Sequence, residues 1–464
     1  MQEYDLIVIG SGVGMRILGL AHEYGLKSAV IEQGPIGGTC LNRGCIPTKI
    51  LTYLADVIME SKQVSKLGVN FKITDIDYPE IMQRMKDQVK TLSDRQLGMI
   101  NDVKNIDLYQ GTGAFIGENV LEVSGRKLTA SSIIIASGSR PLIPRIKGID
   151  EVEYLTNDEA LQLMVQPNSM LIVGGGYVAA EFGHFFSAVG TDVTIIGRNE
   201  YLVKNEDTDV STLLKDELAK RMNVYTNYEV IEVKEEDGQK IAVSRNRESG
   251  EIERFKGEVL LIAAGRRSNA DILHPEMTGV QVDENGWIIV DDYFRTSKMG
   301  IWALGDAIGR YQFRHVANEE YRVLWHNMMQ QHENDYRKMK YDAIPRAVFS
   351  YPPIATVGMT LREAKNAGFK ILVAETDYSW VAKGFAMGNP PSLVRIIVNE
   401  ESRKILGSTI VGPHAPILIQ EIINLMYTSE GTDEKLFEAI HIHPALSEVV
   451  QRVLYKLSPL EGQN

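Results

Sequence analysis

The sequence predicts an α/β protein with two Rossmann-like dinucleotide-binding domains. Three observations predict this fold class: a glycine-rich turn between a strand and a helix occurs twice, a second strand follows each of these helices, and a length of 464 residues allows about three domains of ~150 residues. Hydrophobic residues make up 44% of the chain and charged residues 24%, the balance of a folded globular protein.

Charge and cysteine content exclude several classes of protein. The formal net charge of −12 repels polyanions, so we expect no nucleic-acid partner. Two cysteines cannot form a disulfide framework, and such low usage fits a reducing compartment. No apolar run reaches the ~18 residues of a membrane span, and the chain opens on a strand rather than on a leader. We therefore expect a cytoplasmic protein that does not associate with membranes.

The first dinucleotide unit starts with a strand at residues 4–10. The turn GSGVGM follows, then an amphipathic helix at 17–24 and a strand at 28–32. In such a unit Gly10 permits the tight turn, and Gly12 lets backbone amides approach a pyrophosphate at the positive end of the helix dipole. The sequence predicts a dinucleotide at this turn.

Two further positions refine this prediction. Glu32 ends the second strand, where a carboxylate can hydrogen-bond both hydroxyls of an adenosine ribose. The third glycine position of the fingerprint holds Met15, so we expect either a helix that stands further from the strand or a shifted main chain.

The same pattern recurs in SMLIVGGGYVAAEFGHFFSAVGTDVTIIGRN, where Gly174, Gly176 and Ala179 complete the fingerprint. Two such units in one chain predict two dinucleotides, and therefore transfer of electrons or hydride between them. A single unit would indicate an ordinary dehydrogenase.

The end of the second strand distinguishes the two nucleotide sites. Gly197 stands where the first unit has its ribose-binding acid, and Arg198 and Lys204 follow. Two cations without a carboxylate suit a 2′-phosphate, so this site is predicted to bind NADPH, with NADH as the alternative. In the competing interpretation both cations are solvated loop charges and Glu200 binds the ribose.

Both cysteines, Cys40 and Cys45, lie in GGTCLNRGCIPTK. Metal binding needs further Cys or His ligands nearby, and there are none, so we expect no metal site. A helix is predicted to begin at Pro47, and a thiol near a helix N-terminus has a stabilised thiolate. A redox-active pair is therefore preferred over two buried structural cysteines. The apolar positions of this helix are Ile50, Leu51, Leu54, Val57 and Ile58.

The C-terminal segment HIHPALSEVV predicts an acid–base pair. Pro444 suits the first turn of a helix whose apolar stripe is Leu446, Val449, Val450, Val453, Leu454 and Leu457. Thiol–disulfide exchange needs a proton for the leaving thiolate, and imidazole titrates near neutrality. His443 is therefore a candidate acid, with Glu448 one turn further as the group that orients it; His441 has no such support.

Taken together, CLNRGCIPTK, IIIASGSRP, LLIAAGRRSN and TSKMGIWALGDA resemble the flavoprotein disulfide reductases, the class I pyridine nucleotide-disulfide oxidoreductases. The resemblance covers essentially the whole chain. Within the family, GSGVGMRIL, GRRSNADIL, WVAKGFAM and HIHPALSEVV are most similar to the mycothione reductase branch, and the dihydrolipoamide dehydrogenase branch is next.

The resemblance implies FAD in the first unit and a nicotinamide nucleotide in the second. The residues implied for FAD are Gly10, Gly12, Gly14, Glu32, Gly38, Thr39, Lys49, Gly113, Ser137, Gly138 and Asp306. Those implied for NAD(P)H are Gly174, Gly176, Tyr177, Glu181, Arg198, Lys204 and Gly265. Tyr177 would be an aromatic gate over the flavin, with simple packing as the alternative, and Glu181 would pair with Lys49.

The resemblance also implies four segments and a homodimer. Residues 1–150 and 271–340 would bind FAD, residues 151–270 NAD(P)H, and residues 341–464 would form an α+β interface domain. His443 and Glu448 would then serve the cysteine pair of the other subunit, giving shared active sites.

The implied activity passes electrons from NADPH through FAD to a strained Cys40–Cys45 disulfide, then to a small disulfide substrate. Cys40 would attack the substrate and Cys45 would lie beside the flavin. Arg43 replaces a usually apolar residue of the family; it would stabilise the thiolate, receive an anionic substrate, or remain solvated. One rival function is dihydrolipoamide oxidation. A second is mercuric ion reduction, but this chain lacks the extra cysteines characteristic of mercuric reductases. A third is nucleotide binding by a flavoprotein without catalysis.

Overall fold

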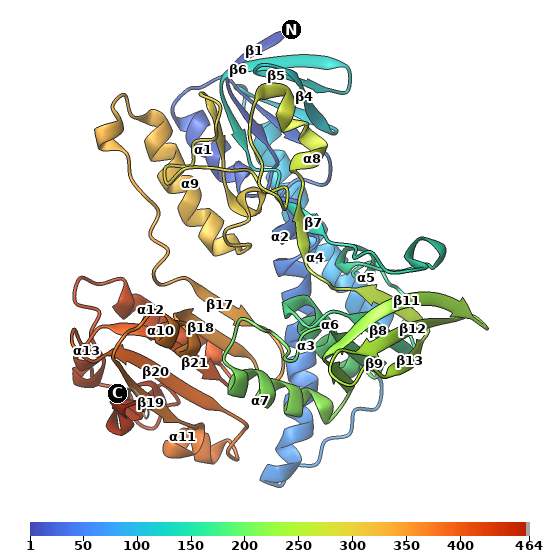
Figure 1. Cartoon of the computed structure of the whole chain (residues 1–464), viewed down its shortest axis with the longest axis vertical. Coiled ribbons are helices and arrows are strands. Elements are labelled where there is room, and N and C mark those ends of the chain that lie inside the picture. The colour runs from blue at the N-terminus through green and yellow to red at the C-terminus, as the bar shows by residue number, and fades with distance from the viewer. Residues whose placement is uncertain (461–464) are drawn as a thin grey trace.

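The computed structural model describes residues 1–460, and its largest sheets are a mostly parallel one, a fully parallel one and an antiparallel one (Figure 1). This architecture confirms the predicted α/β fold class with Rossmann-type units. The long helix α3, Cys45–Gln63, runs from the first sheet, at the top of Figure 1, down between the other two. Its first residue is Cys45, so the helix begins two residues before the expected Pro47.

The first sheet has the order β3-β2-β1-β6-β5-β4, with β16 added beside β6. The pairs β3–β2, β2–β1, β1–β6 and β6–β16 are parallel, whereas β4 and β5 form an antiparallel extension. The strands are β1 Gln2–Ile9, β2 Ser28–Glu32, β3 Ile106–Gln110, β4 Gly113–Gly117, β5 Val120–Val123, β6 Arg126–Ile135 and β16 Ile301–Ala303. Strand β16 comes from far along the chain, so the segment near residue 300 completes a sheet that the N-terminus begins.

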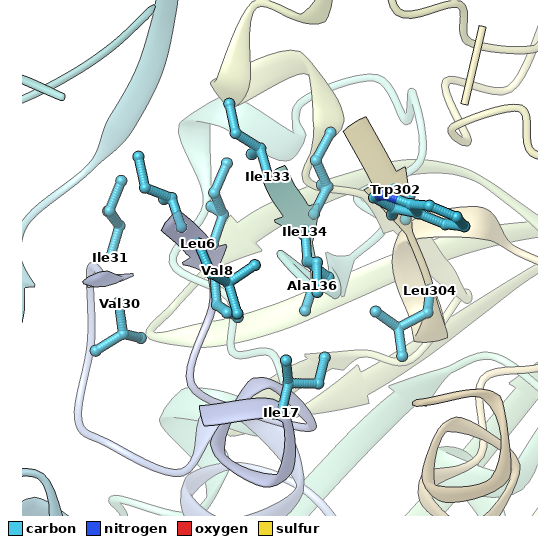
Figure 2. Close-up of a cluster of buried hydrophobic side chains, with 14 of the residues drawn as sticks. Leu6, Val8, Ile17, Val30, Ile31, Ile133, Ile134, Ala136, Trp302 and Leu304 are labelled. Atoms are coloured by element: carbon cyan, nitrogen blue, oxygen red, sulfur yellow. The ribbon is translucent and has the colours of Figure 1, made fainter. Parts of the chain in front are cut away.

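The core of this domain explains its strand sequences. Leu6 to Ile9 are all buried, because a parallel sheet is covered on both faces and its strands need no polar side. Figure 2 shows Leu6 and Val8 of β1 beside Ile133 and Ile134 of β6, with Ile17 of α1 packed below them. Helix α1 is Gly14–Glu23, and α9, Arg314–Met329, packs against the same core.

The second parallel sheet has the order β10-β9-β8-β14 and carries the second glycine turn. Its strands are β8 Ser169–Val173, β9 Asp192–Gly197, β10 Asn223–Thr226 and β14 Val259–Ile262, and its helices are α6 Tyr177–Val189 and α7 Thr208–Ala219. An antiparallel three-stranded sheet lies beside it, made of β11 Tyr228–Glu236, β12 Gln239–Asn246 and β13 Ile252–Gly257. A two-stranded ribbon of β7 Ser139–Pro141 and β15 Arg266–Ser268 joins the chain segments that enter and leave this domain.

The C-terminal part contains an antiparallel sheet of order β17-β18-β21-β20-β19-β22. Its strands are β17 Pro345–Val348, β18 Ile354–Gly358, β19 Ile371–Thr376, β20 Leu393–Asn399, β21 Ile405–Val411 and β22 Ser458–Pro459. Its helices are α10 Leu361–Asn366, α11 Ala382–Ala386, α12 Ala415–Met426, α13 Asp433–Glu438 and α14 Glu448–Arg452. The remaining helices of the described chain are α2 Gly38–Asn42, α4 Tyr78–Asn101, α5 Asn157–Ala160 and α8 Ala270–Leu273.

Buried ion pairs fasten the C-terminal sheet to the second parallel sheet. Arg346 of β17 donates to Glu206 at 2.7 Å, and the Glu206 side chain is only 1% exposed. Arg395 of β20, which is 4% exposed, pairs with Asp207 at 3.0 Å and also with Asp209. All three acids lie in the segment that runs from β9 into α7, which therefore has a fixed position against the C-terminal part.

Candidate active site

A long cavity follows the carboxyl ends of β1, β2 and β6. Of the residues expected to bind the first dinucleotide, those that line this cavity are Gly10, Gly12, Glu32, Gly38, Thr39, Gly113, Ser137, Gly138 and Asp306. Cys40 and Cys45 lie in the same wall. Gly14 and Lys49 are not among the lining residues. The structure thus brings the first glycine turn and the cysteine pair to one cavity.

The glycine turn leaves no space for side chains. Gly10 has φ of +101°, and a Cβ there would lie 2.3 Å from the carbonyl oxygen of Ala136. A Cβ on Gly38 would lie 2.6 Å from the Cα of Gly12, so the turn packs directly on the segment that leads to Cys40. No side chain of residues 1–460 caps the start of α1, which leaves its N-terminal amides for a ligand.

Gly14 takes the place of the third fingerprint glycine. A Cβ on Gly14 would lie 2.7 Å from Cγ1 of Val8, so Gly14 provides the close approach of helix to strand that the third fingerprint glycine normally provides. Met15, the next residue, packs its partly buried side chain against the core. The expectation that α1 stands away from the strand because of Met15 is therefore wrong: the close-packing position has moved by one residue.

Glu32 is held rigidly at the edge of the cavity. Its Oε2 accepts hydrogen bonds from the amide of Ser11 at 2.8 Å and from the Ser11 hydroxyl at 2.7 Å, and its Oε1 accepts from the amide of Gly34 at 2.8 Å. The side chain of Glu32 is buried, with 7% exposure. A carboxylate fixed in this way is suited to accept hydrogen bonds from ribose hydroxyls.

The rest of the cavity fits a dinucleotide such as FAD. The buried hydroxyl of Ser137 has no hydrogen-bond partner within residues 1–460, as expected for a polar group that would bond to a cofactor. Asp306 accepts from the hydroxyl of Ser139 at 2.6 Å, and Arg266 lies 3.8 Å from the same carboxylate oxygen. These residues would hold the ribityl and pyrophosphate part of the cofactor.

The two cysteines are free thiols with different acidities. Cys40 lies in α2 and Cys45 is the first residue of α3. The hydrogen bond from the Cys40 thiol, helped by the charge of Lys49, lowers the pKa of Cys45 to about 7. The same hydrogen bond, with burial, raises the pKa of Cys40. Cys45 is thus the more acidic thiol of the pair.

Lys49 connects the cysteine helix to the second dinucleotide unit. Its Nζ lies 2.6 Å from Oε2 of Glu181 on α6 and 4.3 Å from the ring centre of Phe349. The other oxygen of Glu181 accepts from the amide of Phe349 at 3.1 Å. The structure therefore brings Lys49 and Glu181 together between the two nucleotide sites, one turn of α3 from Cys45.

Arg43 lines the same cavity as the two cysteines and forms an ion pair with Asp158. Its guanidinium lies 3.4 Å from Oδ2 of Asp158, and its carbonyl accepts a hydrogen bond from Asn157. Lys49, rather than Arg43, is the cation that lowers the pKa of Cys45. The structure thus gives Arg43 a role in attaching α2 to α5.

The second glycine turn repeats the geometry of the first. Gly174 has φ of +146°, and a Cβ there would lie 2.1 Å from the carbonyl oxygen of Ala263, close to Gly265. Gly176 precedes the first residue of α6, and no side chain in the described part of the chain caps that end. The amides at this helix start are thus exposed to a second nucleotide.

The two cations expected to bind at the adenosine ribose are exposed and unpaired in the described part of the chain. Arg198 and Lys204 are exposed, and neither side chain forms an ion pair with any residue from 1 to 460. The carboxylate of Glu200 accepts the hydroxyl of its neighbour Tyr201 at 2.7 Å. Arg247, which the sequence did not single out, donates to the carbonyl oxygen of Arg198 and adds a third positive charge.

Tyr177 is the first residue of α6, and its side chain is largely buried. Burial raises the pKa of its phenol to about 12, and the hydroxyl has no partner among the residues that the structure describes. Its ring lies 6.1 Å from that of Phe313, at the entry to α9. An aromatic side chain in this position can pack, as here, or swing aside.

His443 and Glu448 are in contact at the C-terminal end. His443 Nδ1 lies 2.9 Å and 3.1 Å from the two carboxylate oxygens of Glu448. The hydrogen bond from His443 lowers the pKa of Glu448, and the charge of Arg452 adds to this effect. The imidazole side chain is 63% exposed, so its other nitrogen is free to meet a substrate or another subunit.

The expected helix start at Pro444 is wrong. The α-helix α14 begins only at Glu448, because the amides of residues 448–450 bond to carbonyls three residues back, so that residues 445–447 form turns rather than α-helix. The Glu448 carboxylate also accepts from the amide of Ala445. The apolar stripe is nevertheless buried at Leu446, Val449, Val450, Val453 and Leu454. No residue beyond Ala317 lines the cysteine cavity in the described chain, so His443 is absent from its own chain's thiol site.

The described residues contain no cluster of three or more His, Cys, Asp or Glu side chains placed to hold a metal ion. Within the same range, each helix is too short or too polar to cross a bilayer.

Sequence reasoning missed four residues that contact this site. Ser11 and Arg266 fix the carboxylates of Glu32 and Asp306, Arg314 lines the cavity near Gly12, and Arg452 binds Glu448. Only Arg452 had a readable signal, since it lies four residues after Glu448 on an expected helix. Ser11 lies between the two fingerprint glycines but contacts Glu32 only through the fold, and Arg266 and Arg314 come from segments that are remote in sequence.

These features define an oxidoreductase that uses two dinucleotides and a dithiol. A family model described as pyridine nucleotide-disulphide oxidoreductase matches residues 4–320, and the model of its dimerisation domain matches residues 344–454. The chain therefore belongs to the pyridine nucleotide-disulphide oxidoreductases, whose members use FAD and a nicotinamide nucleotide.

Several members of the family are similar over almost the whole chain. A mycothione reductase from Mycobacterium tuberculosis is 36% identical over 472 residues, covering 98% of this chain and 100% of that protein. A dihydrolipoyl dehydrogenase from Chlamydia muridarum is 32% identical over 454 residues, covering 97% and 95%. The solved structure of the HOCl-induced flavoprotein disulfide reductase RclA from Escherichia coli has a TM-score of 0.86 at 27% identity, covering 97% and 99%.

Proposed function

We propose that this protein is an NADPH-dependent reductase of a low-molecular-weight disulfide, with FAD and the Cys40–Cys45 pair as its redox centres. The observation that carries the proposal is the position of both thiols in the wall of the dinucleotide cavity. Similarity to a mycothione reductase supports a small disulfide as substrate. Two thiols in active use also fit the reducing cytoplasm as the location.

We assign residues 1–150 and 271–340 to FAD binding, 151–270 to nucleotide binding and 341–464 to the subunit interface. When bound, the flavin supplies the two-electron relay between the nicotinamide nucleotide and the cysteine pair. Lys49 and Glu181 would form an ion pair at a fixed position between the two sites. Tyr177 would move aside to admit the nicotinamide. His443 and Glu448 of the partner subunit would complete the thiol site in a homodimer.

The thiol chemistry follows from the acidities of the pair. Cys40 gives its proton to His443 of the partner subunit and attacks one substrate sulfur. The substrate S–S bond breaks, a mixed disulfide with Cys40 forms, and the histidine returns the proton to the departing thiolate. The Cys45 thiolate then attacks the Cys40 sulfur, which expels the second half of the substrate as a thiolate that takes its proton from solvent and restores the Cys40–Cys45 disulfide. Two electrons pass from the dithiol to the substrate.

The first test is anaerobic turnover of the purified flavoprotein on a panel of small disulfides and on dihydrolipoamide. We expect NADPH to drive reduction of at least one small disulfide, with Cys40→Ser and Cys45→Ser each lowering kcat by more than about 100-fold. Efficient dihydrolipoamide oxidation with NAD, and no disulfide reduction, would favour the dihydrolipoyl dehydrogenase function. A colourless protein, or a Cys45→Ser variant of native activity, would reject both.

The second test concerns the nucleotide. Loss of one phosphate-binding cation costs roughly 10- to 100-fold, so Arg198→Gln should raise KM for NADPH by about that factor and leave KM for NADH unchanged. Lys220→Gln removes a surface charge from the same domain and serves as the matched control. Equal turnover of wild-type protein with NADH and NADPH would contradict the preference.

A further inference from the structure

The carboxylate of Glu448 is shared by two cations. Its Oε1 accepts from His443 Nδ1 at 2.9 Å and from Nη2 of Arg452 at 2.7 Å. Its Oε2 accepts from His443 and from the amide of Ala445 at 3.2 Å. With a side chain only 4% exposed, Glu448 has little contact with water that could replace either partner. The site is therefore a His–Glu–Arg triad rather than a pair.

Helix geometry fixes Arg452 in this position. Residues four apart lie on the same face of a helix, and Arg452 is four residues after Glu448 in α14. Its side chain is 37% exposed, and its Nη2 bonds to the same carboxylate oxygen, Oε1, that His443 Nδ1 contacts. The two cations approach one acceptor, which places like charges near each other whenever the imidazole is protonated.

Charged side chains on the elements packed around this triad bond to groups other than His443 and Glu448. His441 lies beside Glu421 of α12, and Lys435 of α13 pairs with Glu430 and Glu438. Lys456, in the turn after α14, donates to Thr376 and lies over the ring of Trp380. Among residues 1–460, Arg452 is the cation besides His443 that bonds to Glu448.

A carboxylate beside a histidine stabilises the imidazolium, and a strong His–Glu pair therefore makes the imidazole a better base and a weaker acid. Thiol–disulfide exchange needs both roles near neutral pH. A guanidinium on the same carboxylate opposes the stabilisation by repulsion and by competing for the acceptor oxygen.

We propose that Arg452 is a positioning residue that sets the acid strength of His443 through Glu448. The inference rests on the proposed function and identifies the residue that tunes its proton transfer. With Arg452 present, His443 accepts the Cys40 proton and can still release it to the departing thiolate. Without Arg452, the proton stays on the imidazole to higher pH, and the same exchange requires more alkaline conditions.

The experiment compares Arg452→Gln, Arg452→Met and Arg452→Lys holoenzymes with wild type, using bis(2-hydroxyethyl) disulfide as the probe. The pH profile of kcat/KM for this alkyl disulfide should move to higher pH by about 0.5 unit in the Gln and Met variants and stay in place in the Lys variant. Anaerobic reduction of the flavin by NADPH, which does not use His443, should keep its rate in all variants.

Arg295→Gln is the matched control, because Arg295 also bonds to a carboxylate four residues away, at Asp291, and has a similar side-chain exposure of 34%. A native pH profile in both Arg452→Gln and Arg452→Met would overturn the proposal, as would an equal displacement in Arg295→Gln. Wild-type enzyme that reduces no disulfide at any pH would reject the proposed function itself. A Glu448→Gln variant with native turnover would reject the role of the triad alone.

Discussion

At the scale of single residues, Cys45 is the more acidic of the two thiols. It lies at the N-terminus of α3, accepts a hydrogen bond from Cys40 and has Lys49 one turn away, and each of these features favours the thiolate. The sequence indicated the helix and the cysteine pair. It did not indicate which of the two sulfurs would be ionised, because that asymmetry arises from the direction of one hydrogen bond and from the charges around the cavity.

The low pKa of Cys45 predicts how the reactivity of this thiol in the reduced protein depends on pH. The pKa is lowered to about 7, so the thiolate is populated above that pH and protonated below it. Alkylation of Cys45 by iodoacetamide should therefore rise with pH around a midpoint near 7. Lys49→Met removes the favourable charge and should move the midpoint upward, whereas Lys66→Met, on a 3-10 turn far along the chain, should not. An unchanged midpoint in Lys49→Met would show that Lys49 does not act on the thiol.

At the scale of elements, the packing of α1 on β1 decides where the pyrophosphate turn lies. The contact of Gly14 with Val8 shows that the helix approaches the strand as closely as in a standard fingerprint, although the third glycine is displaced. The sequence identified the displacement and left two alternatives, a helix further from the strand or a shifted main chain, and the close contact of Gly14 with Val8 rules out the first. The helix instead begins at Gly14, and Met15 reaches the core beside it.

A Cβ at position 14 would overlap the Val8 side chain, so Gly14→Ala should destabilise the protein by about 1–3 kcal/mol. Val8→Ala removes the overlapping methyl group. The double variant should therefore lose less stability than the sum of the two single variants. Urea midpoints and the dissociation constant for FAD are the measurements. Strict additivity of the two changes would contradict the close contact.

At the scale of the whole molecule, a buried charge network fixes the second parallel sheet against the C-terminal part. Two arginines of the C-terminal sheet form ion pairs with acids of one segment of the nucleotide-binding domain: Arg346 with Glu206, and Arg395 with Asp207 and Asp209. The same segment carries Lys204, whose carbonyl oxygen accepts from Arg362 of α10. The cation expected to bind a 2′-phosphate is thus positioned by a different domain, and nucleotide affinity depends on how these domains dock.

Breaking one buried pair should loosen this docking. Arg346→Met leaves Glu206 buried without its cation, and such changes cost about 3–5 kcal/mol. We expect a lower urea midpoint, with part of the loss recovered in the Glu206→Gln, Arg346→Met double variant. Lys338→Met, which breaks an exposed pair with Asp292, should leave the midpoint unchanged. Equal effects of Arg346→Met and Lys338→Met would argue against a docking role for the network.

The sequence by itself determined the two dinucleotide units, the cysteine pair and the His443–Glu448 contact. Each of these depends on residues close together in the chain, where the local geometry of helices, strands and turns sets the distances. Only the tertiary structure decided how they combine. Lys49 meets Glu181, Arg43 meets Asp158 and Arg346 meets Glu206 across more than a hundred residues of chain, because packing of separate domains, rather than local periodicity, brings these charges together.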